Sequence, residues 1–227
     1  MNPIIVALDF DSAAQARQLV DRLAGHVSFY KVGLELYTAA GMEFVRELTG
    51  AGKNVFLDLK LYDIGETVKR AVARIAESGA RLTTVHGSGA VMRAAVEGRS
   101  GSELKLLAVT VLTSFDQEDL ADLGYPCGVA ELVELRVRKA MDAGIDGLVC
   151  SPLEAARVRA IAGPRAVLVT PGVRSPGAAQ GDQKRVATPA EAMASGANYL
   201  VIGRQITRAA DPAAEALHIL EELGSSI

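Results

Sequence analysis

Short apolar runs recur along the whole chain, and stretches with apolar residues at helical spacing separate them. Runs rich in β-branched residues and leucine predict eight strands, at 4–10, 29–34, 54–61, 82–87, 105–113, 147–151, 166–172 and 199–204. The stretches between the runs are rich in Ala, Glu and Arg, as in "SAAQARQLVDRLAG" at 12–25. In the stretch at 188–196, Thr188 and Glu191 have the spacing of a capping box, which predicts a helix start. The pattern therefore predicts eight strand–helix units.

The predicted strands are apolar on nearly every residue, so both of their faces must be covered. This is the condition of a parallel sheet built from right-handed strand–helix–strand crossovers. An open doubly wound sheet and a closed barrel both satisfy it. The eight units, the length of 227 residues and the lack of any linker or shift in composition favour one α/β domain over 1–227, a (β/α)₈ TIM barrel.

Composition narrows the classes of partner. The net charge is −3, and Lys and Arg are spread along the chain, so no basic face indicates nucleic acid or anionic lipid. No apolar run approaches the roughly 20 residues of a membrane span. The chain has two cysteines and opens without an export signal, which predicts a cytoplasmic protein with reduced thiols, Cys150 being a small core residue. A small-molecule ligand is the expected partner.

Charged residues interrupt the apolar runs near their C-terminal ends. Asp9 closes the first predicted strand, Asp58 and Lys60 close the third, and Arg204 closes the eighth. In a (β/α)₈ barrel these ends carry the functional side chains. Because side chains alternate along a strand, Asp58 and Lys60 are expected to point the same way, into the barrel mouth.

Lys31, in the second predicted strand, and Asp63, at the turn after the third, extend this set of charges. A lone buried Asp–Lys pair is most simply a structural salt bridge, but such pairs contribute little net stability. An alternation of Lys31, Asp58, Lys60 and Asp63 instead indicates a functional network. An ammonium between carboxylates stays protonated, so it can act as a general acid or stabilise a carbanion. A fixed carboxylate beside it would repel a substrate carboxylate.

A second site is indicated by "TPGVRSPGAAQGDQKR" at 170–185 and "VIGR" at 201–204. In barrel enzymes the loops after strands seven and eight commonly bind phosphate through backbone N–H groups and an arginine. The first segment is either a mobile lid, with Arg174 and Gln183 reaching an anion, or a solvated surface loop. The "VIGR" string favours the phosphate interpretation.

Together these strings resemble one family. "ALDF", "FYKVGLEL", "FLDLKLYDIGETV", "VTVLTS", "TPGVR", "GDQKR" and "VIGR" occur in this order over nearly the whole chain and are similar to bacterial orotidine 5′-phosphate decarboxylases. The D-x-K-x-x-D-I motif at 58–64 is specific to that superfamily. The resemblance implies cofactor-free decarboxylation of orotidine 5′-monophosphate to uridine 5′-monophosphate in de novo pyrimidine synthesis, with no metal.

The resemblance also implies roles for single residues. Lys60 would protonate the C6 carbanion, and Asp58 would lie against the departing carboxylate. The residues implied to bind the rest of the substrate are Asp9 and Lys31 (ribose), Thr113 (pyrimidine), Arg174, Gln183, Gly203 and Arg204 (phosphate side), with Gln183 also touching the base. Family members are homodimers with shared sites, in which the residues matching Asp63 and Thr67 enter the partner's site.

The motif departs from its familiar form at one place, because Gly65 and Glu66 replace Pro-Asn before Thr67. A glycine at the helix start should loosen it slightly without touching the chemistry.

Two other functions stay open. Sugar-phosphate lyases of similar sequence use Mg²⁺ and have a glutamate where this chain has Lys31, and a protonated lysine is no metal ligand. A barrel could also bind nucleotides without turning them over. His86 is expected to have a structural hydrogen-bonding role, since no second ligand lies at metal spacing.

Overall fold

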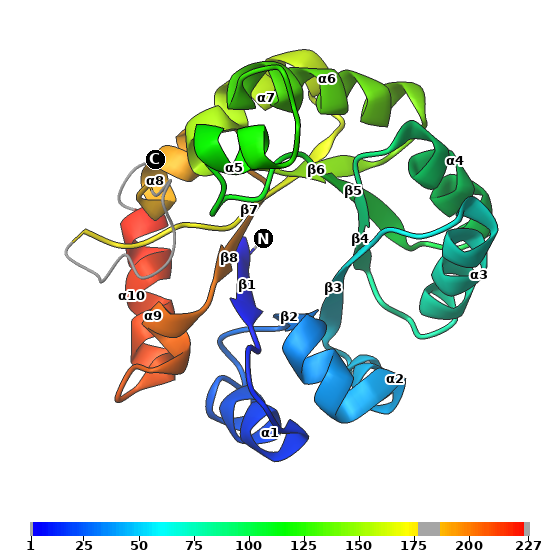
Figure 1. The fold of residues 1–227 in the computed structure, drawn as a ribbon. Coiled ribbons are helices and arrows are strands. Elements are labelled where there is room, and N and C mark those ends of the chain that lie inside the picture. Colours follow the sequence, from blue (N-terminus) through cyan, green and yellow to red (C-terminus); the bar gives the residue numbers. More distant parts are fainter. Residues whose placement is uncertain (1, 177–186, 225–227) are drawn as a thin grey trace.

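The structure is a computed structural model that describes residues 2–176 and 187–224. Its strands form a closed barrel in which each pairs in parallel with its neighbours, and β1 pairs with β8 to close the ring (Figure 1). The strands are β1 (Ile4–Ala7), β2 (Phe29–Gly33), β3 (Asn54–Leu61), β4 (Leu82–His86), β5 (Lys105–Val109), β6 (Gly147–Val149), β7 (Val167–Thr170) and β8 (Tyr199–Ile202). The predicted eight-stranded (β/α)₈ barrel is confirmed.

Helices form an outer ring around the strands (Figure 1). They are α1 (Ala13–Arg22), α2 (Leu34–Gly50), α3 (Gly65–Ala76), α4 (Gly89–Gly98), α5 (Gln117–Asp122), α6 (Val129–Asp142), the 3₁₀ turn η1 (Pro152–Glu154), α7 (Ala155–Ala162), α8 (Pro189–Ala194), α9 (Arg204–Thr207) and α10 (Pro212–Gly224). The predicted capping box is confirmed at the start of α8, where Thr188 and Glu191 satisfy each other's backbone N–H groups. In the described part of the chain, no helix has the length and apolar character to cross a bilayer.

Apolar side chains fill two separate layers, which explains the nearly continuous apolar runs. In β1, Ile5 and Ala7 point into the barrel centre, whereas Ile4 and Val6 pack between the barrel and the helices. The inner layer is small and is formed by Ile5, Ala7, Phe29, Phe56, Leu82, Leu107, Val169 and Val201. Both faces of each strand are therefore covered, as a parallel barrel requires.

The inner layer ends below the C-terminal ends of the strands, and polar residues continue it there. Residues two positions further along the same inward face are Lys31 after Phe29, Asp58 after Phe56 and Thr84 after Leu82. The barrel thus has an apolar floor and a charged mouth.

All strands except β3 are shorter than the sequence predicted, and for two of them this changes where a site residue lies. β1 ends at Ala7 and β8 at Ile202, so Asp9 and Arg204 lie beyond the strands rather than on them. Arg204 is the first residue of α9. The apolar and β-branched composition does not mark where the ladder of backbone hydrogen bonds stops, and this explains the difference.

Candidate active site

A cavity of about 730 Å³ opens at the C-terminal ends of the strands. It contains most of the site residues expected from the sequence. Those that line it are Asp9, Lys31, Asp58, Lys60, Thr113, Arg174, Gly203 and Arg204. Residues from both ends of the chain therefore meet in one site, because β1 and β8 are neighbours in the closed barrel.

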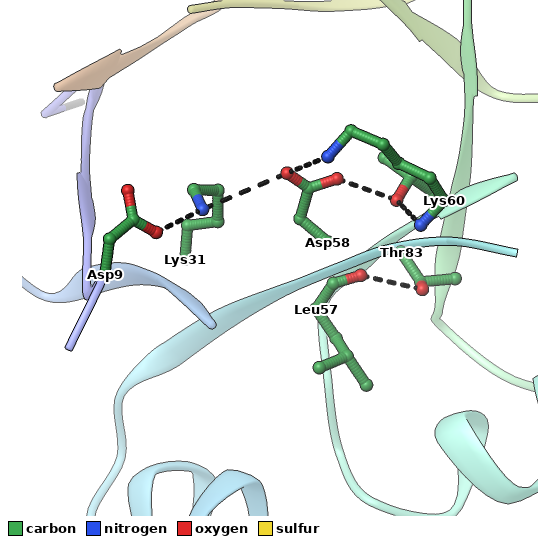
Figure 2. A network of polar contacts seen from close by, with 7 residues as sticks. Asp9, Lys31, Leu57, Asp58, Lys60 and Thr83 are labelled. Atoms are coloured by element: carbon green, nitrogen blue, oxygen red, sulfur yellow. Dashed lines mark hydrogen bonds and ion pairs between the residues drawn. The ribbon is translucent and has the colours of Figure 1, made fainter. Parts of the chain in front are cut away.

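Four charged side chains lie in a row along one side of this cavity (Figure 2). Lys31 Nζ lies 2.9 Å from Asp9 Oδ1 and 4.0 Å from Asp58 Oδ2. Lys60 Nζ donates to the same Asp58 Oδ2 at 2.9 Å. Two cations and two anions alternate, so each charged group has an oppositely charged group as its neighbour.

Asp58 is held more firmly than its two lysine contacts alone would hold it. Thr84 Oγ1 on β4 donates to Asp58 Oδ1 at 2.9 Å and also accepts from the backbone N–H of Lys60 at 2.9 Å. The Asp58 side chain is only 12% exposed, whereas that of Lys60 is 39% exposed. A fixed carboxylate therefore lies beside a more accessible ammonium.

The backbone at Lys60 is unusual. Of the described residues other than glycine, Lys60 is the one with positive φ, at 50°. The β3–β4 register also shifts between Leu57 and Leu61. Regular alternation, from which the sequence predicted that Asp58 and Lys60 point the same way, does not extend through Lys60. An irregular strand end brings the ammonium to Asp58 instead, and such left-handed conformations are concentrated at functional sites.

Gly33 leaves the space in which Lys31 and Asp9 meet. A Cβ added to Gly33 would lie 2.7 Å from Lys31 Nζ and 3.3 Å from Asp9 Oδ1. Any other residue there would displace the Lys31 ammonium. The glycine therefore belongs to the site although it carries no functional group.

Two arginines lie at the side of the cavity formed after β7 and β8. The pKa of Arg174 is lowered from its ordinary value, first by burial and then by the like charge of Arg204. Arg174 Nη1 donates to the carbonyl of Val173 at 2.6 Å. Two guanidinium groups that repel each other across a cavity wall favour an anion placed against both.

The segment predicted to be a lid lies mostly outside the described residues, and Gln183 lies outside them as well. Its two flanks are described and are joined to each other. Arg174 N–H donates to the carbonyl of Ala187 at 3.0 Å, in a parallel bridge between Val173 and Ala187. The position of Arg174 is thus tied to the chain on both sides of the segment.

Asp63 and Thr67 are not among the described residues that line the cavity. Both are exposed, and Asp63 Oδ1 accepts from the backbone N–H of Ile64 at 2.6 Å. Helix α3 starts at Gly65 without a side-chain cap, and a Cβ there would approach Ala94 no closer than 3.4 Å. Within one chain, the structure does not bring these two motif residues to the charged row.

Sequence reasoning missed Thr84, which contacts both members of the central pair. A signal existed: Thr84 lies two residues after the inward-facing Leu82, so the alternation of β4 directs it to the mouth. Phe10, Glu35 and Arg208 also line the cavity, and the periodicity of the sequence did not single them out.

His86, at the end of β4, lies in a second cavity of about 470 Å³ and not in the first. Its ring contacts that of Tyr62, with 5.1 Å between centroids. Burial, and secondarily the charge of Arg136, lowers the pKa of His86. Among residues 2–176 and 187–224, no group of three or more His, Cys, Asp or Glu side chains is arranged to hold a metal ion.

These features define a class of protein, a (β/α)₈ barrel whose cavity joins an alternating Asp–Lys row to a pair of arginines suited to a small anionic ligand. Residues 2–219 match the model of the family described as orotidine 5′-phosphate decarboxylase / HUMPS family. The chain belongs to this family.

Curated relatives agree with this assignment. The chain is 54% identical over 223 residues to the "Orotidine 5'-phosphate decarboxylase" of Rhodopseudomonas palustris (strain ATCC BAA-98 / CGA009), covering 98% of this chain and 94% of the relative. It is 52% identical to the protein of that name from Methylobacterium sp. (strain 4-46), covering 98% of this chain and 96% of the relative. The crystal structure of orotidine 5'-phosphate decarboxylase from Lactobacillus acidophilus is also similar, with a TM-score of 0.86 and 36% identity, covering 98% of this chain and 99% of the other.

Proposed function

We propose that the cavity decarboxylates orotidine 5′-monophosphate to uridine 5′-monophosphate without a cofactor, and that Lys60 delivers the proton to C6. Membership of the family and the names of the curated relatives support the activity, that of a carboxy-lyase in pyrimidine synthesis. The observation that carries the mechanism is the contact of the Lys60 ammonium with the largely buried carboxylate of Asp58 at 2.9 Å.

In the proposed reaction, the bond between C6 and the carboxylate carbon breaks, CO₂ leaves, and the electron pair stays on C6. Asp58 lies against the substrate carboxylate, and the repulsion between the two anions is relieved when CO₂ departs. The Lys60 ammonium stabilises the developing negative charge and then transfers its proton to C6. A proton from solvent restores the ammonium, so atoms and charges balance without an oxidant or reductant.

The remaining contacts are proposed to bind the nucleotide away from the reacting carbon. Asp9 and Lys31 would hold the ribose hydroxyls, which accept from an ammonium and donate to a carboxylate. Thr113 would bind the pyrimidine. Gly203 and the two arginines would bind the phosphate, as would Gln183, which lies outside the described residues. Mutual repulsion between Arg174 and Arg204 supports this role, because a phosphate dianion would relieve it.

The alternative within the family is a magnesium-dependent sugar-phosphate lyase. Lys31 argues against it, because its ammonium lies between the carboxylates of Asp9 and Asp58. A cation of the protein itself thus takes the position where carboxylates would otherwise be suited to Mg²⁺.

An absorbance assay separates the three functions. Purified protein is mixed with orotidine 5′-monophosphate, with and without a chelator of divalent cations. The proposal expects equal loss of the substrate absorbance in both samples. Loss that the chelator abolishes would indicate metal-dependent chemistry, and binding without turnover would indicate a nucleotide-binding protein.

A homodimer with shared active sites is also proposed. Asp63 and Thr67 are exposed, and beside them Tyr62 and Ile64 are 68% and 76% exposed. Large apolar side chains at a motif helix support a surface that a second copy covers. Asp63 would then complete the partner's site. A cytoplasmic location, expected from the sequence, also stays a prediction.

Subunit mixing tests the shared site. Lys60→Ala and Asp63→Ala, each inactive alone, are mixed and allowed to exchange. About half of the dimers become mixed, with one site carrying both substitutions and the other carrying neither, so activity should return to roughly a quarter of wild type. Exchange without recovery would assign both residues to a site within one chain.

A further inference from the structure

The two residues that directly follow the cavity arginines in the sequence are hydrogen-bonded to each other. Ser175 follows Arg174, and Gln205 follows Arg204. The Ser175 backbone N–H donates to Gln205 Oε1 at 3.1 Å, and Gln205 Nε2 donates to Ser175 Oγ at 2.7 Å. The loop after β7 is thereby joined to α9, which follows β8, at the residues next to both arginines.

This pair is anchored to the C-terminal helix α10. Gln205 Nε2 donates its second hydrogen to Glu215 Oε1 at 2.8 Å. The Ser175 hydroxyl, which accepts from Gln205, donates to Glu222 Oε2 at 2.8 Å. All hydrogen-bonding atoms of the Gln205 amide are used, and its orientation is fixed because only Nε2 can donate to a carboxylate.

Burial makes these bonds effective. Ser175 is 7% exposed, so water competes poorly for its hydroxyl and its backbone N–H. Loss of one partner would leave buried groups unsatisfied, and the loop after β7 would be free to shift. A closed set of bonds of this kind defines one geometry rather than a range of geometries.

We propose that Gln205 and Ser175 are positioning residues that fix the spacing of Arg174 and Arg204 for binding of the substrate phosphate. The inference rests on the phosphate role proposed for the arginines. The Ser175–Gln205 pair joins the loop after β7 to α9 at the residues next to both arginines, so it limits how far their backbones can move apart. The binding geometry is then present before the ligand arrives, which lowers the cost of ordering it.

The test compares Gln205→Ala with wild type on two substrates, orotidine 5′-monophosphate and the nucleoside orotidine. For the nucleotide we expect KM to rise about tenfold, with kcat within about twofold, the size of effect of one or two buried hydrogen bonds. For the nucleoside, which has no phosphate, kcat/KM should stay unchanged. A role confined to folding would lower turnover of both substrates alike through loss of active protein.

Two further sets of variants give the test its controls. Ser175→Ala should raise the nucleotide KM, and combining it with Gln205→Ala should add little, because both remove one set of bonds. Ser175→Ala also keeps the test valid if Gln205→Ala does not fold. On α10, Glu222→Ala removes the acceptor of the Ser175 hydroxyl and should raise the nucleotide KM, whereas Glu103→Ala, the same change at an exposed glutamate before β5, should not.

Arg204→Ala, measured alongside, separates this inference from the phosphate assignment. If Arg204→Ala harms only the nucleotide while Gln205→Ala and Ser175→Ala leave KM unchanged or harm both substrates equally, the positioning role is wrong and the phosphate site stands. If Arg204→Ala itself harms both substrates equally, the phosphate assignment and the positioning role are both overturned.

Discussion

The two sides of the cavity differ in how their charged side chains are arranged. Along β2 and β3, Lys31 and Lys60 alternate with carboxylates at distances of 2.9 to 4.0 Å, so the charges are balanced within the protein. At the side formed after β7 and β8, Arg174 and Arg204 carry the same charge, and burial together with the charge of Arg204 lowers the pKa of Arg174. One side pairs opposite charges within the protein, whereas the other places two like charges at the cavity.

This difference matches the two tasks of the proposed reaction. Chemistry at the reacting carbon needs charges that are already in place, because reorganisation during the reaction would add to the barrier. Phosphate binding instead supplies free energy, and two neighbouring guanidinium groups gain from an arriving dianion. The substitutions below test this contrast, in decreasing order of the change that each should produce.

Lys60→Ala removes one cation from the row of alternating charges formed by Asp9, Lys31, Asp58 and Lys60. We expect kcat to fall about 10³-fold or more, since the proton donor and the stabilising charge are both lost. Binding of uridine 5′-monophosphate should persist, because the arginine side is untouched. Lys105→Ala, at the exposed start of β5, is the matched control and should keep full turnover. A Lys60→Ala enzyme with more than about a tenth of wild-type turnover would contradict the role of Lys60.

Arg204→Ala removes one of the two arginines at the side of the cavity formed after β7 and β8. Loss of a charge-assisted contact to phosphate should lower kcat/KM for the nucleotide about 10²-fold or more, with little effect on the nucleoside. The comparison is made by steady-state kinetics on both substrates, with Arg165→Ala, an exposed arginine, as control. Equal losses on the two substrates would show that Arg204 does not bind the phosphate.

Thr84→Val tests whether the row of alternating charges depends on the hydrogen bonds of the Thr84 hydroxyl. Valine keeps the shape but removes the hydroxyl that donates to Asp58 and accepts from the Lys60 backbone. We expect kcat to fall about tenfold, since one buried hydrogen bond to a charged group is lost. The neighbouring Thr83→Val also removes a hydroxyl, one that donates to the Leu57 carbonyl outside the cavity. Thr83→Val should cost stability and leave kcat unchanged, and a similar fall in both variants would count against a special role for Thr84.

His86 provides a titratable group that belongs to neither side. Its pKa is lowered, so the folded protein binds a proton less readily than the unfolded chain, whose histidine titrates near 6.5. The stability from neutral His86 is complete above about pH 6.5 and is lost as pH falls towards the lower folded value.

Urea unfolding checks this at pH 8 and pH 5.5. The free energy of unfolding should fall more between these pH values in wild type than in His86→Phe, a variant that retains a ring beside Tyr62. The difference between the two falls should be only about a few tenths of a kcal/mol, because the site is partly solvated. Identical pH dependence in both proteins would exclude a contribution from His86.

The architecture and the identity of most cavity residues could be predicted from the order of amino acids alone. Two-faced apolar strands alternating with helical stretches have few solutions, and a closed parallel barrel brings the ends of all its strands to one mouth. This is why Asp9 and Arg204, far apart in the chain, could be assigned to one site from the pattern of strands and charges. Local hydrogen bonding was equally predictable where it depends on near neighbours, as in the Thr188–Glu191 capping box.

The orientation of the charged side chains, and the hydrogen bonds that hold them, depend instead on contacts between elements. The positive φ of Lys60 and the shifted β3–β4 register follow from pairing with β4, which a strand's own residues do not encode. The Thr84 contact to Asp58 and the Ser175–Gln205 pair join residues 26 and 30 positions apart. Such contacts depend on the distance between side chains of different elements, which periodicity does not specify. The sequence therefore names the charged groups of the cavity, and packing between elements fixes their geometry.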